Sequence, residues 1–291
     1  MRILILGGDG MLGHKLLQHF QSAHSVKVTL RQELTAYEHV GLFNAQNAYA
    51  GVDVRSSDRI LEVLAAFRPE VVINAVGIVK QRASAKESIP SLEINALFPH
   101  RLAVMCEAVG ARLIHMSTDC VFSGRKGNYA EYDSSDAEDL YGRTKFLGEL
   151  REPHCITLRT SIIGRELSRK TGLVEWFLAQ KGGRCQGFSR AIFSGLTSQA
   201  LAEVMADLIE KYPGMSGLYH VSGEPIPKYD LLQLMNEVYC LGVMIERDDD
   251  FVYDRSLDST RFRKTTGWRP KPWRVMIEQM AQDPTPYSSW E

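Results

Sequence analysis

The sequence has few cysteines, no long apolar run and no excess of either charge, and each absence excludes a class of protein. The cysteines never form a C-x-x-C pair, which argues against a disulfide framework and favours a reducing compartment; they stand at 106, 120, 155, 185 and 240. The apolar run at residues 3–6 is too short for a signal peptide. No stretch reaches the roughly 18 apolar residues of a membrane-spanning helix. We therefore expect a cytoplasmic protein without a membrane partner.

The charges nearly cancel, since 34 Lys and Arg residues stand against 35 Asp and Glu residues. Nucleic-acid binding by bulk charge needs a basic excess, so we expect no nucleic-acid partner. Any anionic ligand must be held by a few donors placed close to it. The eight histidines show no metal-ligand spacing, and no metal site is predicted.

The order of apolar and helically periodic stretches predicts an α/β fold. Strands are expected at 3–6, 25–30, 71–75, 112–117 and 155–160, and helices at 11–20, 57–67, 89–109, 141–150 and 197–211. Residues 32–52 lack a clear period and are expected to be irregular. Alternating strands and helices with short connections form a parallel sheet that is covered by helices on both faces.

Three glycines separate the first predicted strand from the first helix. Gly7, Gly10 and Gly13 have the spacing G-x-x-G-x-x-G, and Met11 and Leu12 complete the loop. Gly7 permits the turn, Gly10 lets the backbone approach a phosphate, and Gly13 lets the helix pack on the strand. A simple tight turn would have the same spacing. The position between strand and helix favours a dinucleotide, whose pyrophosphate would meet the helix N-terminus.

The end of the second predicted strand indicates which dinucleotide is preferred. An acidic residue there would bind the ribose hydroxyls of NADH, whereas arginine accommodates the 2′-phosphate of NADPH. Arg31 stands at this place. A solvated surface charge is the alternative interpretation. We predict NADPH, with NADH as the second candidate cofactor.

Two further segments are expected around the dinucleotide. Asp53 and Val54 precede the helix at 57–67 and would either contact the adenine or belong to the start of that helix. Ala75, Val76 and Gly77 follow the third strand, and their small size lets the chain pass close to the nicotinamide ribose.

Tyr141 and Lys145 are candidates for catalysis because their i, i+4 spacing puts them on one helix face. A phenol with a pKa near about 10 needs a nearby cation before it can exchange a proton at neutral pH. Lys145 supplies that cation and can also bind the nicotinamide ribose. Thr118, after the strand at 112–117, can donate a hydrogen bond to a carbonyl oxygen. Together these groups predict the reduction of a carbonyl by hydride transfer.

The chain resembles the extended short-chain dehydrogenases and, within them, the dTDP-4-dehydrorhamnose reductase-like family. The resemblance runs nearly end to end. It rests on GGDGMLG (7–13), VVINAVG (71–77), INALFPHRLA (94–103), STDCVFSG (117–124), YGRTK (141–145) and LRTSIIG (158–164). It implies NAD(P)H-dependent reduction of a nucleotide-linked 4-keto-6-deoxy sugar in polysaccharide biosynthesis, such as that of dTDP-rhamnose or O-antigen. Carried over by position, Thr118, Tyr141 and Lys145 are the catalytic set.

The same resemblance implies a Rossmann-type, doubly wound parallel sheet with a smaller C-terminal substrate-binding lobe. We expect the NADP-binding domain to comprise residues 1–161 and about 196–221. The lobe would comprise about 162–195 and 222–291. A homodimer is left open.

Two departures from the family bear on the sugar. Cys120 follows the Thr-Asp pair where the family usually has Tyr, and Ile162 stands where it often has Trp. In the family these positions face the substrate, as Asp119 and Val121 are expected to do. A UDP-linked 2-acetamido sugar is therefore a second candidate substrate. Cys120 is more simply a small packed thiol than a nucleophile.

Arg159 and Arg255 are candidates for the substrate diphosphate, because a guanidinium fork matches phosphate oxygens. A structural role is an equally good interpretation of each. The acidic run at 248–250 is expected to be a solvated loop.

Three other functions belong to proteins with a similar pattern. A 4,6-dehydratase carries an Asp-Glu pair after the Thr, and Cys120 replaces that Glu here. A 4-epimerase with retained NAD would use the same Tyr141 and Lys145. A non-catalytic subunit, like the regulatory subunit of methionine adenosyltransferase, resembles the same family. The last two stay open.

Overall fold

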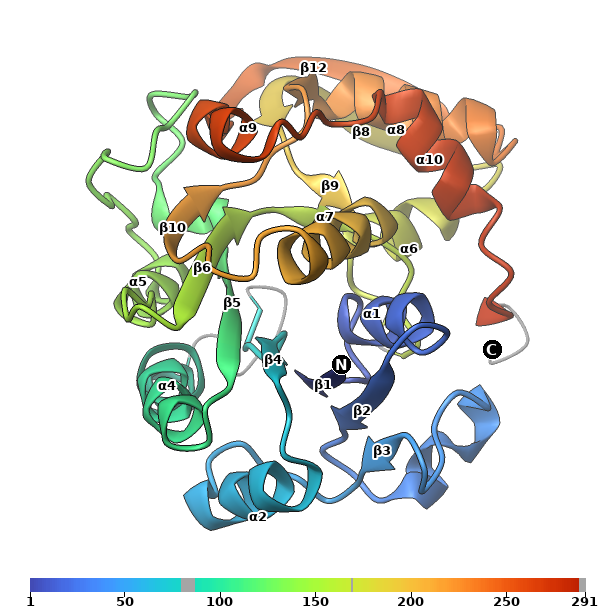
Figure 1. Cartoon of the computed structure of the whole chain (residues 1–291). Coiled ribbons are helices and arrows are strands. Elements are labelled where there is room, and N and C mark those ends of the chain that lie inside the picture. Colours follow the sequence, from blue (N-terminus) through green and yellow to red (C-terminus); the bar gives the residue numbers. More distant parts are fainter. Residues whose placement is uncertain (80–86, 169, 288–291) are drawn as a thin grey trace.

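The centre of the molecule is a seven-stranded parallel sheet with the order β10-β6-β5-β4-β1-β2-β3 (Figure 1). The computed structural model describes residues 1–79, 87–168 and 170–287. The strands are β1 Arg2–Leu6, β2 Ser25–Thr29, β3 Ala48–Tyr49, β4 Val71–Asn74, β5 Arg112–Thr118, β6 Cys155–Thr160 and β10 Gly217–His220. The order reverses at β1, so the sheet is doubly wound and ligands are expected at the carboxyl ends of its strands. The predicted fold class is confirmed.

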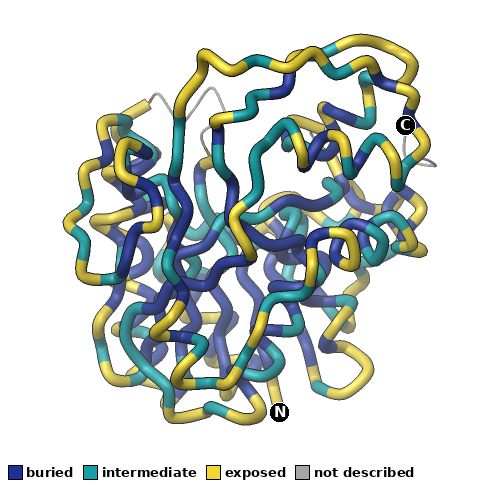
Figure 2. The backbone as a smooth tube through the Cα atoms, turned by 90° about the horizontal axis from the view of Figure 1, so that it is seen from above, coloured by how far each residue is buried: buried dark blue, intermediate teal, exposed yellow. Residues whose placement is uncertain are grey.

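Helices cover both faces because β1 is apolar on both. Ile3 and Ile5 lie in one core with α1 and α7, whereas Leu4 and Leu6 lie in a second core with α2 and α4. Successive side chains of a strand point to opposite faces, so a continuous apolar run fits a sheet that is covered twice. These helices are α1 Gly13–Phe20, α2 Ser57–Phe67, α4 Phe98–Ala108 and α7 Ser198–Glu210. Figure 2 shows the buried strands inside and the exposed loops at the periphery.

A smaller three-stranded sheet, β11-β8-β12, lies above the large one in Figure 1. Its core is continuous with that of the large sheet, since Met235 and Met276 belong to the same cluster as Ile3. The elements of this part are α6 Leu173–Leu178, β8 Arg184–Phe193, β11 Ile226–Pro227, α8 Lys228–Val238, β12 Met244–Asp254, α9 Thr260–Thr266 and α10 Trp273–Ala281. A separate two-stranded pair joins β7 Ile162–Ile163 to β9 Leu196–Thr197.

Three predicted segments differ from the structure. The region 32–52 contains the 3-10 helix η1 Leu34–Val40 as well as β3. The helix expected at 89–109 is α3 Ser88–Ser91, the π-helical η3 Leu92–Leu97 and then α4. Pro99 has no N–H to give to the carbonyl of Asn95, which favours the wider turn. The acidic run at 248–250 was wrongly predicted as a loop, because it lies in β12 at a bulge between Asp248 and Val252.

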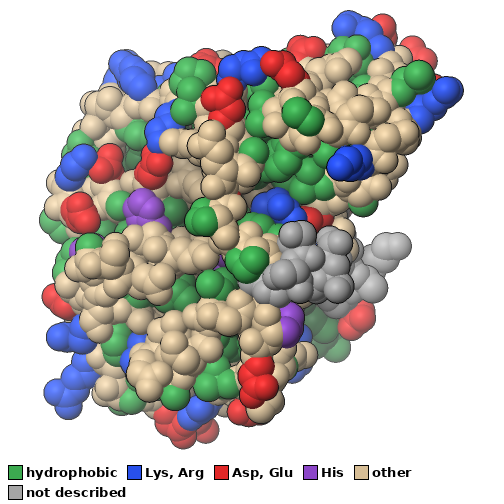
Figure 3. All heavy atoms as spheres, turned by 90° about the vertical axis from the view of Figure 1, so that its right-hand side faces the viewer, with side chains coloured by type: hydrophobic (Ala, Val, Ile, Leu, Met, Phe, Trp, Pro, Cys, Tyr) green, Lys and Arg blue, Asp and Glu red, His purple; other side chains and the backbone are tan. Residues whose placement is uncertain are grey.

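On the face drawn in Figure 3, acidic and basic side chains are interspersed, in keeping with the balanced charges of the sequence. Within the described ranges, no helix combines the length and the apolar character that a membrane crossing requires.

Candidate active site

The loop between β1 and α1 is tight enough to require its glycines. Gly7 has a φ of +85°, a conformation that side chains disfavour. A Cβ on Gly13 would lie 2.0 Å from the Gly7 carbonyl oxygen, so α1 can approach β1 only without it. The Gly10 N–H donates to the same oxygen over 3.1 Å. The amides at the start of α1 thus face outward from a compact turn, as a bound pyrophosphate requires.

A cavity opens beside this loop, and it unites most of the predicted cofactor residues. Its walls are Gly7, Asp9, Gly10, Thr29, Arg31, Val52, Asp53, Val54, Ala75, Val76, Gly77, Ile78 and Ile94. Met11, Leu12 and Gly13 do not line it, and Leu12 belongs to the main core. The prediction missed Asp9, although it stands inside the glycine motif. Thr29 was missed because it lies in an ordinary strand pattern, and Val52 because it ends a stretch without a clear period.

Asp53 is held by its neighbour and does not cap the next helix. Arg55 Nη2 lies 2.5 Å from Asp53 Oδ2. Hydrogen bonds from Arg55 lower the pKa of Asp53 to about 2. Ser56 caps α2 by accepting a hydrogen bond from the Arg59 N–H. The carboxylate of Asp53 therefore stays ionised at the rim of the cavity.

The predicted proton donor lies at the carboxyl end of β5. Helix α5 Leu140–Leu147 carries Tyr141, whose phenol lies close enough to Thr118 for the two hydroxyls to interact. Thr118 Oγ1 also accepts from the Cys120 N–H over 3.1 Å, at the start of η4 Asp119–Val121. A Cβ on Gly142 would lie 2.1 Å from the Cys120 carbonyl oxygen. Only glycine next to Tyr141 lets α5 come this close to the end of β5.

Lys145 lies one helical turn below Tyr141 and is buried. Its Nζ donates to the Met116 carbonyl oxygen over 2.6 Å. Burial lowers the pKa of Lys145 to about 8, so its cation predominates at neutral pH. Burial, reinforced by Cys120, raises the pKa of Tyr141. The phenol therefore holds its proton, which is the form that can donate to a carbonyl oxygen.

Asn95 connects the two parts of the site, and the sequence prediction gave it no role. Its Oδ1 accepts from the Ile78 N–H over 2.9 Å, and its Nδ2 donates to the Ile78 carbonyl oxygen over 3.0 Å. The same amide lies 3.3 Å from Thr144 Oγ1 on α5. Asn95 thus joins Ile78, in the wall of this cavity, to α5, which carries the predicted catalytic residues. A buried amide in the motif INALFPHRLA was the available signal.

Arg255 follows β12 directly and brings a buried cation near the end of β5. Its side chain is 8% exposed, and its guanidinium stacks on the Tyr253 ring at 4.5 Å. Asp119 and Cys120 are close enough to interact with it electrostatically. Among the described residues, its buried Nε has no hydrogen-bond partner. A buried cation that is incompletely paired is unfavourable unless a ligand completes it.

Arg159 does not reach the site, and its predicted contact with a diphosphate does not fit its position. Its Nε and Nη2 donate to the Glu149 carboxylate over 2.7 and 2.8 Å, and only 2% of the side chain is exposed. Its Nη1 lies 3.2 Å from His220 Nε2. A guanidinium with these partners has a structural role.

Val121, Ile162 and Cys120 were also predicted to contact the substrate, and the structure places them in three different environments. Val121 is fully buried in a small core with Phe122 and Leu257, so its side chain does not face the site as predicted. Ile162, in β7, pairs with Leu196 of β9 and packs against the main core. Cys120 stays beside Thr118, and burial raises the pKa of its thiol to about 12. A neutral thiol is a poor nucleophile.

Comparison with known proteins establishes the family. The RmlD substrate binding domain family matches residues 1–238, so the chain belongs to this family. The dTDP-4-dehydrorhamnose reductase of Aggregatibacter actinomycetemcomitans is 24% identical over 303 residues, which are 96% of this chain and 98% of that protein. The predicted resemblance is confirmed.

Two further similarities bear on fold and function. A hypothetical dTDP-4-dehydrorhamnose reductase from Sulfolobus tokodaii has a crystal structure with a TM-score of 0.77 and 26% identity, covering 94% of this chain and 98% of that one. Methionine adenosyltransferase 2 subunit beta of Rattus norvegicus is 30% identical over 152 residues, which are 51% of this chain and 41% of that protein.

Proposed function

We propose that this protein is an NAD(P)H-dependent reductase of a nucleotide-linked 4-keto-6-deoxy sugar, with NADPH as the preferred cofactor. The observation that carries the proposal is that Tyr141, beside Thr118 at the end of β5, lies on the same helix as Lys145, which is buried and held by the Met116 carbonyl. The reductase relatives support the same reaction class.

The hydroxyls of Thr118 and Tyr141 have different roles at the carbonyl oxygen of the substrate. Tyr141 gives the oxygen a proton as negative charge develops there. The Thr118 hydroxyl, which donates to Asp119 Oδ1 over 3.0 Å in the free protein, turns its hydrogen to the substrate oxygen and holds it. When bound, the dinucleotide would supply the hydride for the carbonyl carbon. The Lys145 cation stabilises the phenolate that remains. Asn95 keeps α5 in register with the cofactor cavity through Ile78 and Thr144.

Arg255 is the best candidate for the anionic part of the substrate. It is buried, it stands on the lobe side of Asp119, and its Nε has no partner among the described residues. A diphosphate offers oxygens that match a guanidinium. The division into an NADP-binding domain and a substrate lobe stays a prediction that agrees with this arrangement.

Two sugars remain candidates, dTDP-4-dehydrorhamnose and a UDP-linked 2-acetamido analogue. Cys120 is smaller than the Tyr usual in the family and leaves room beside Thr118. Contacts of this size change selectivity by only about 1–3 kcal/mol, so we expect turnover of both with a preference for the acetamido sugar.

The test is NADPH oxidation by the purified chain with dTDP-, GDP- and UDP-linked 4-keto sugars. We expect consumption with at least one of them and release of the cofactor after turnover. Retained NAD together with interconversion of 4-epimers would support the epimerase instead.

A non-catalytic binding subunit is the second candidate, because the similarity to methionine adenosyltransferase 2 subunit beta reaches 30% identity over 152 residues. The intact set of Thr118, Tyr141 and Lys145 argues for catalysis. Tight NADPH binding without turnover of any keto sugar in the panel would favour the subunit.

A further inference from the structure

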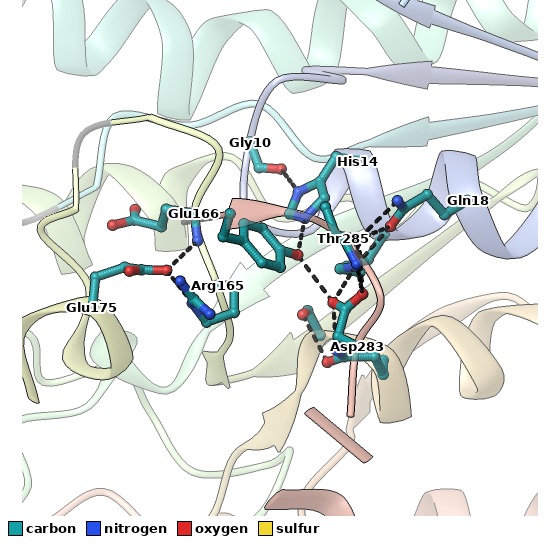
Figure 4. Close-up of polar contacts among 12 residues, drawn as sticks. Gly10, His14, Gln18, Arg165, Glu166, Glu175, Asp283 and Thr285 are labelled. Atoms are coloured by element: carbon teal, nitrogen blue, oxygen red, sulfur yellow. Dashed lines mark hydrogen bonds and ion pairs between the residues drawn. The ribbon is translucent and has the colours of Figure 1, made fainter. Parts of the chain in front are cut away.

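The segment after α10 lies along the first helix, beside the glycine loop. The Asp283 carboxylate forms an ion pair with Lys15 Nζ, and both side chains are almost fully buried. Lys15 also donates to Thr285 Oγ1 over 3.0 Å. Figure 4 shows Asp283 and Thr285 facing α1, with His14 and Gln18 on the helix side.

Tyr287 reaches the glycine loop through one histidine. Its hydroxyl lies 2.8 Å from His14 Nε2, and His14 Nδ1 lies 2.8 Å from the Gly10 carbonyl oxygen. A carbonyl oxygen only accepts, so Nδ1 carries the hydrogen and donates. Burial lowers the pKa of His14 to about 4, so the ring is neutral and its Nε2 is an acceptor. The single hydrogen of the Tyr287 hydroxyl has two acceptors, His14 Nε2 at 2.8 Å and Asp283 Oδ2 at 3.0 Å.

Holding the Gly10 carbonyl fixes the next amide. The peptide unit is planar and trans, so its N–H points opposite to its C=O. The N–H of Met11 therefore has its direction set by the Gly10 oxygen, which accepts from both the backbone and the ring of His14. This N–H belongs to the start of α1, where the first amides have no partner within the helix and can meet a phosphate.

The other side of Tyr287 contacts the part of the chain that follows β7. The Arg165 guanidinium lies over the Tyr287 ring at 4.5 Å, and Arg165 Nε donates to Glu175 over 2.7 Å. Val40 and Leu167 pack against the same ring. Tyr287 is thus fixed on both sides, and it can transmit its position to His14.

We propose that residues 283–287 belong to the dinucleotide site and that Tyr287 and His14 are its positioning residues. They hold the Gly10 carbonyl so that the Met11 amide faces the pyrophosphate of the dinucleotide. The inference rests on the proposed function in one respect, because it requires that the chain binds NADPH or NADH.

The test compares the dissociation constants of NADPH and of adenosine 2′-monophosphate, which has no pyrophosphate. Tyr287→Phe keeps the ring and removes the hydroxyl. We expect it to weaken NADPH binding by about 3- to 10-fold, the effect of one hydrogen bond, and to leave adenosine 2′-monophosphate unchanged. With NADPH saturating, kcat should stay at the unmutated value. Tyr132→Phe is the matched control, since Tyr132 is 88% exposed and lines none of this region.

A second variant tests the route through the histidine. In His14→Asn the side-chain amide can still donate to the Gly10 oxygen, so Tyr287→Phe should have no further effect on NADPH binding in that background. Three results would overturn the inference. Tyr287→Phe could weaken NADPH binding equally in the unmutated chain and in His14→Asn, it could leave the dissociation constant of NADPH unchanged, or it could weaken binding of adenosine 2′-monophosphate as much as that of NADPH. These outcomes leave the reductase proposal intact, whereas failure to bind either dinucleotide would overturn both.

Discussion

In the sheet-bearing half, the site is built from the ends of neighbouring strands, whereas the lobe contributes Arg255 from the end of β12. Gly7 follows β1 and Thr118 is the last residue of β5, and parallel strands bring such ends to one edge. The lobe instead places a buried charge beside Asp119. The first half fixes backbone and hydroxyl geometry, and under the proposed function the second would select the ligand by charge.

Two arginines sharpen this difference. Arg159 lies in β6 of the large sheet, and Glu149 satisfies it with two hydrogen bonds. Arg255 is nearly as buried, but its Nε has no partner among the described residues. Burial alone does not distinguish a structural arginine from one that binds a ligand. The hydrogen-bond partners of each guanidinium make the distinction.

Tyr141→Phe should give the largest loss of activity. The variant keeps the ring and removes the proton donor, so we expect kcat to fall by about 100-fold or more. The dissociation constant of NADPH, measured by fluorescence titration, should not change. A near-normal kcat would remove Tyr141 from the chemistry.

Arg159→Met should destabilise the fold and spare the chemistry. Removing one partner of a buried ion pair leaves Glu149 uncompensated and costs about 3–5 kcal/mol of unfolding free energy. Denaturant unfolding measures this, and kcat/KM at low temperature should survive. Adding Glu149→Gln should restore part of the stability. A raised substrate KM without loss of stability would assign Arg159 to the substrate after all.

Arg255→Met should impair substrate binding and leave the stability of the fold intact. Loss of a charged hydrogen bond to the substrate would raise KM by about 10- to 100-fold. The free energy of unfolding should stay the same or increase, because an incompletely paired buried charge is removed. If Arg255→Met loses as much unfolding free energy as Arg159→Met and its KM for the substrate is unchanged, the proposed difference between the two arginines is wrong.

The pH dependence should follow Lys145, whose pKa is lowered to about 8 by burial. Its cation is present below that pH and is lost above it, so kcat/KM should fall as the pH rises through about 8. The pKa of Tyr141 is raised, so the phenol keeps its proton over this range. Lys145→Arg, if active, should move the fall to higher pH. A profile that is flat through this range would contradict the assigned role.

Arg31→Ala should give the smallest effect. Arg31 is exposed at the rim of the cofactor cavity, so water and salt screen its contact with a 2′-phosphate. We expect the preference for NADPH over NADH to narrow by about 3- to 10-fold. Equal kcat/KM for the two cofactors in the unmutated protein would show that Arg31 does not select between them.

Much of the large sheet could be predicted from the sequence because its strands are short apolar runs with clear ends. The strand expected at 155–160 has the same bounds in the structure. The π-helical turn at 92–97 could not be predicted in this way. It contains Asn95, which gains its partners Ile78 and Thr144 only after folding. The acidic residues 248–250 were misread because they lie at a bulge inside β12, and it is the residues on either side of the bulge that pair with β8.

For the site, local motifs predicted the residues that act close to their own strand. Gly7, Gly10 and Arg31 line one cavity, as their spacing suggested. The two arginines looked alike in sequence, because the partner that satisfies Arg159 is a glutamate ten residues earlier, in the connection between α5 and β6. Pairing between distant side chains leaves no local pattern to read.

The central claim is that the meeting point of the two halves transfers a hydride and a proton to a sugar carbonyl. The most direct measurement uses NADPH deuterated at C4 of its nicotinamide, the keto-sugar nucleotide that is turned over best, and NMR of the sugar product. We predict deuterium at C4 of the reduced sugar with the unmutated chain and almost none with Tyr141→Phe. Binding of the labelled NADPH without deuterium in any sugar of the panel would contradict the account.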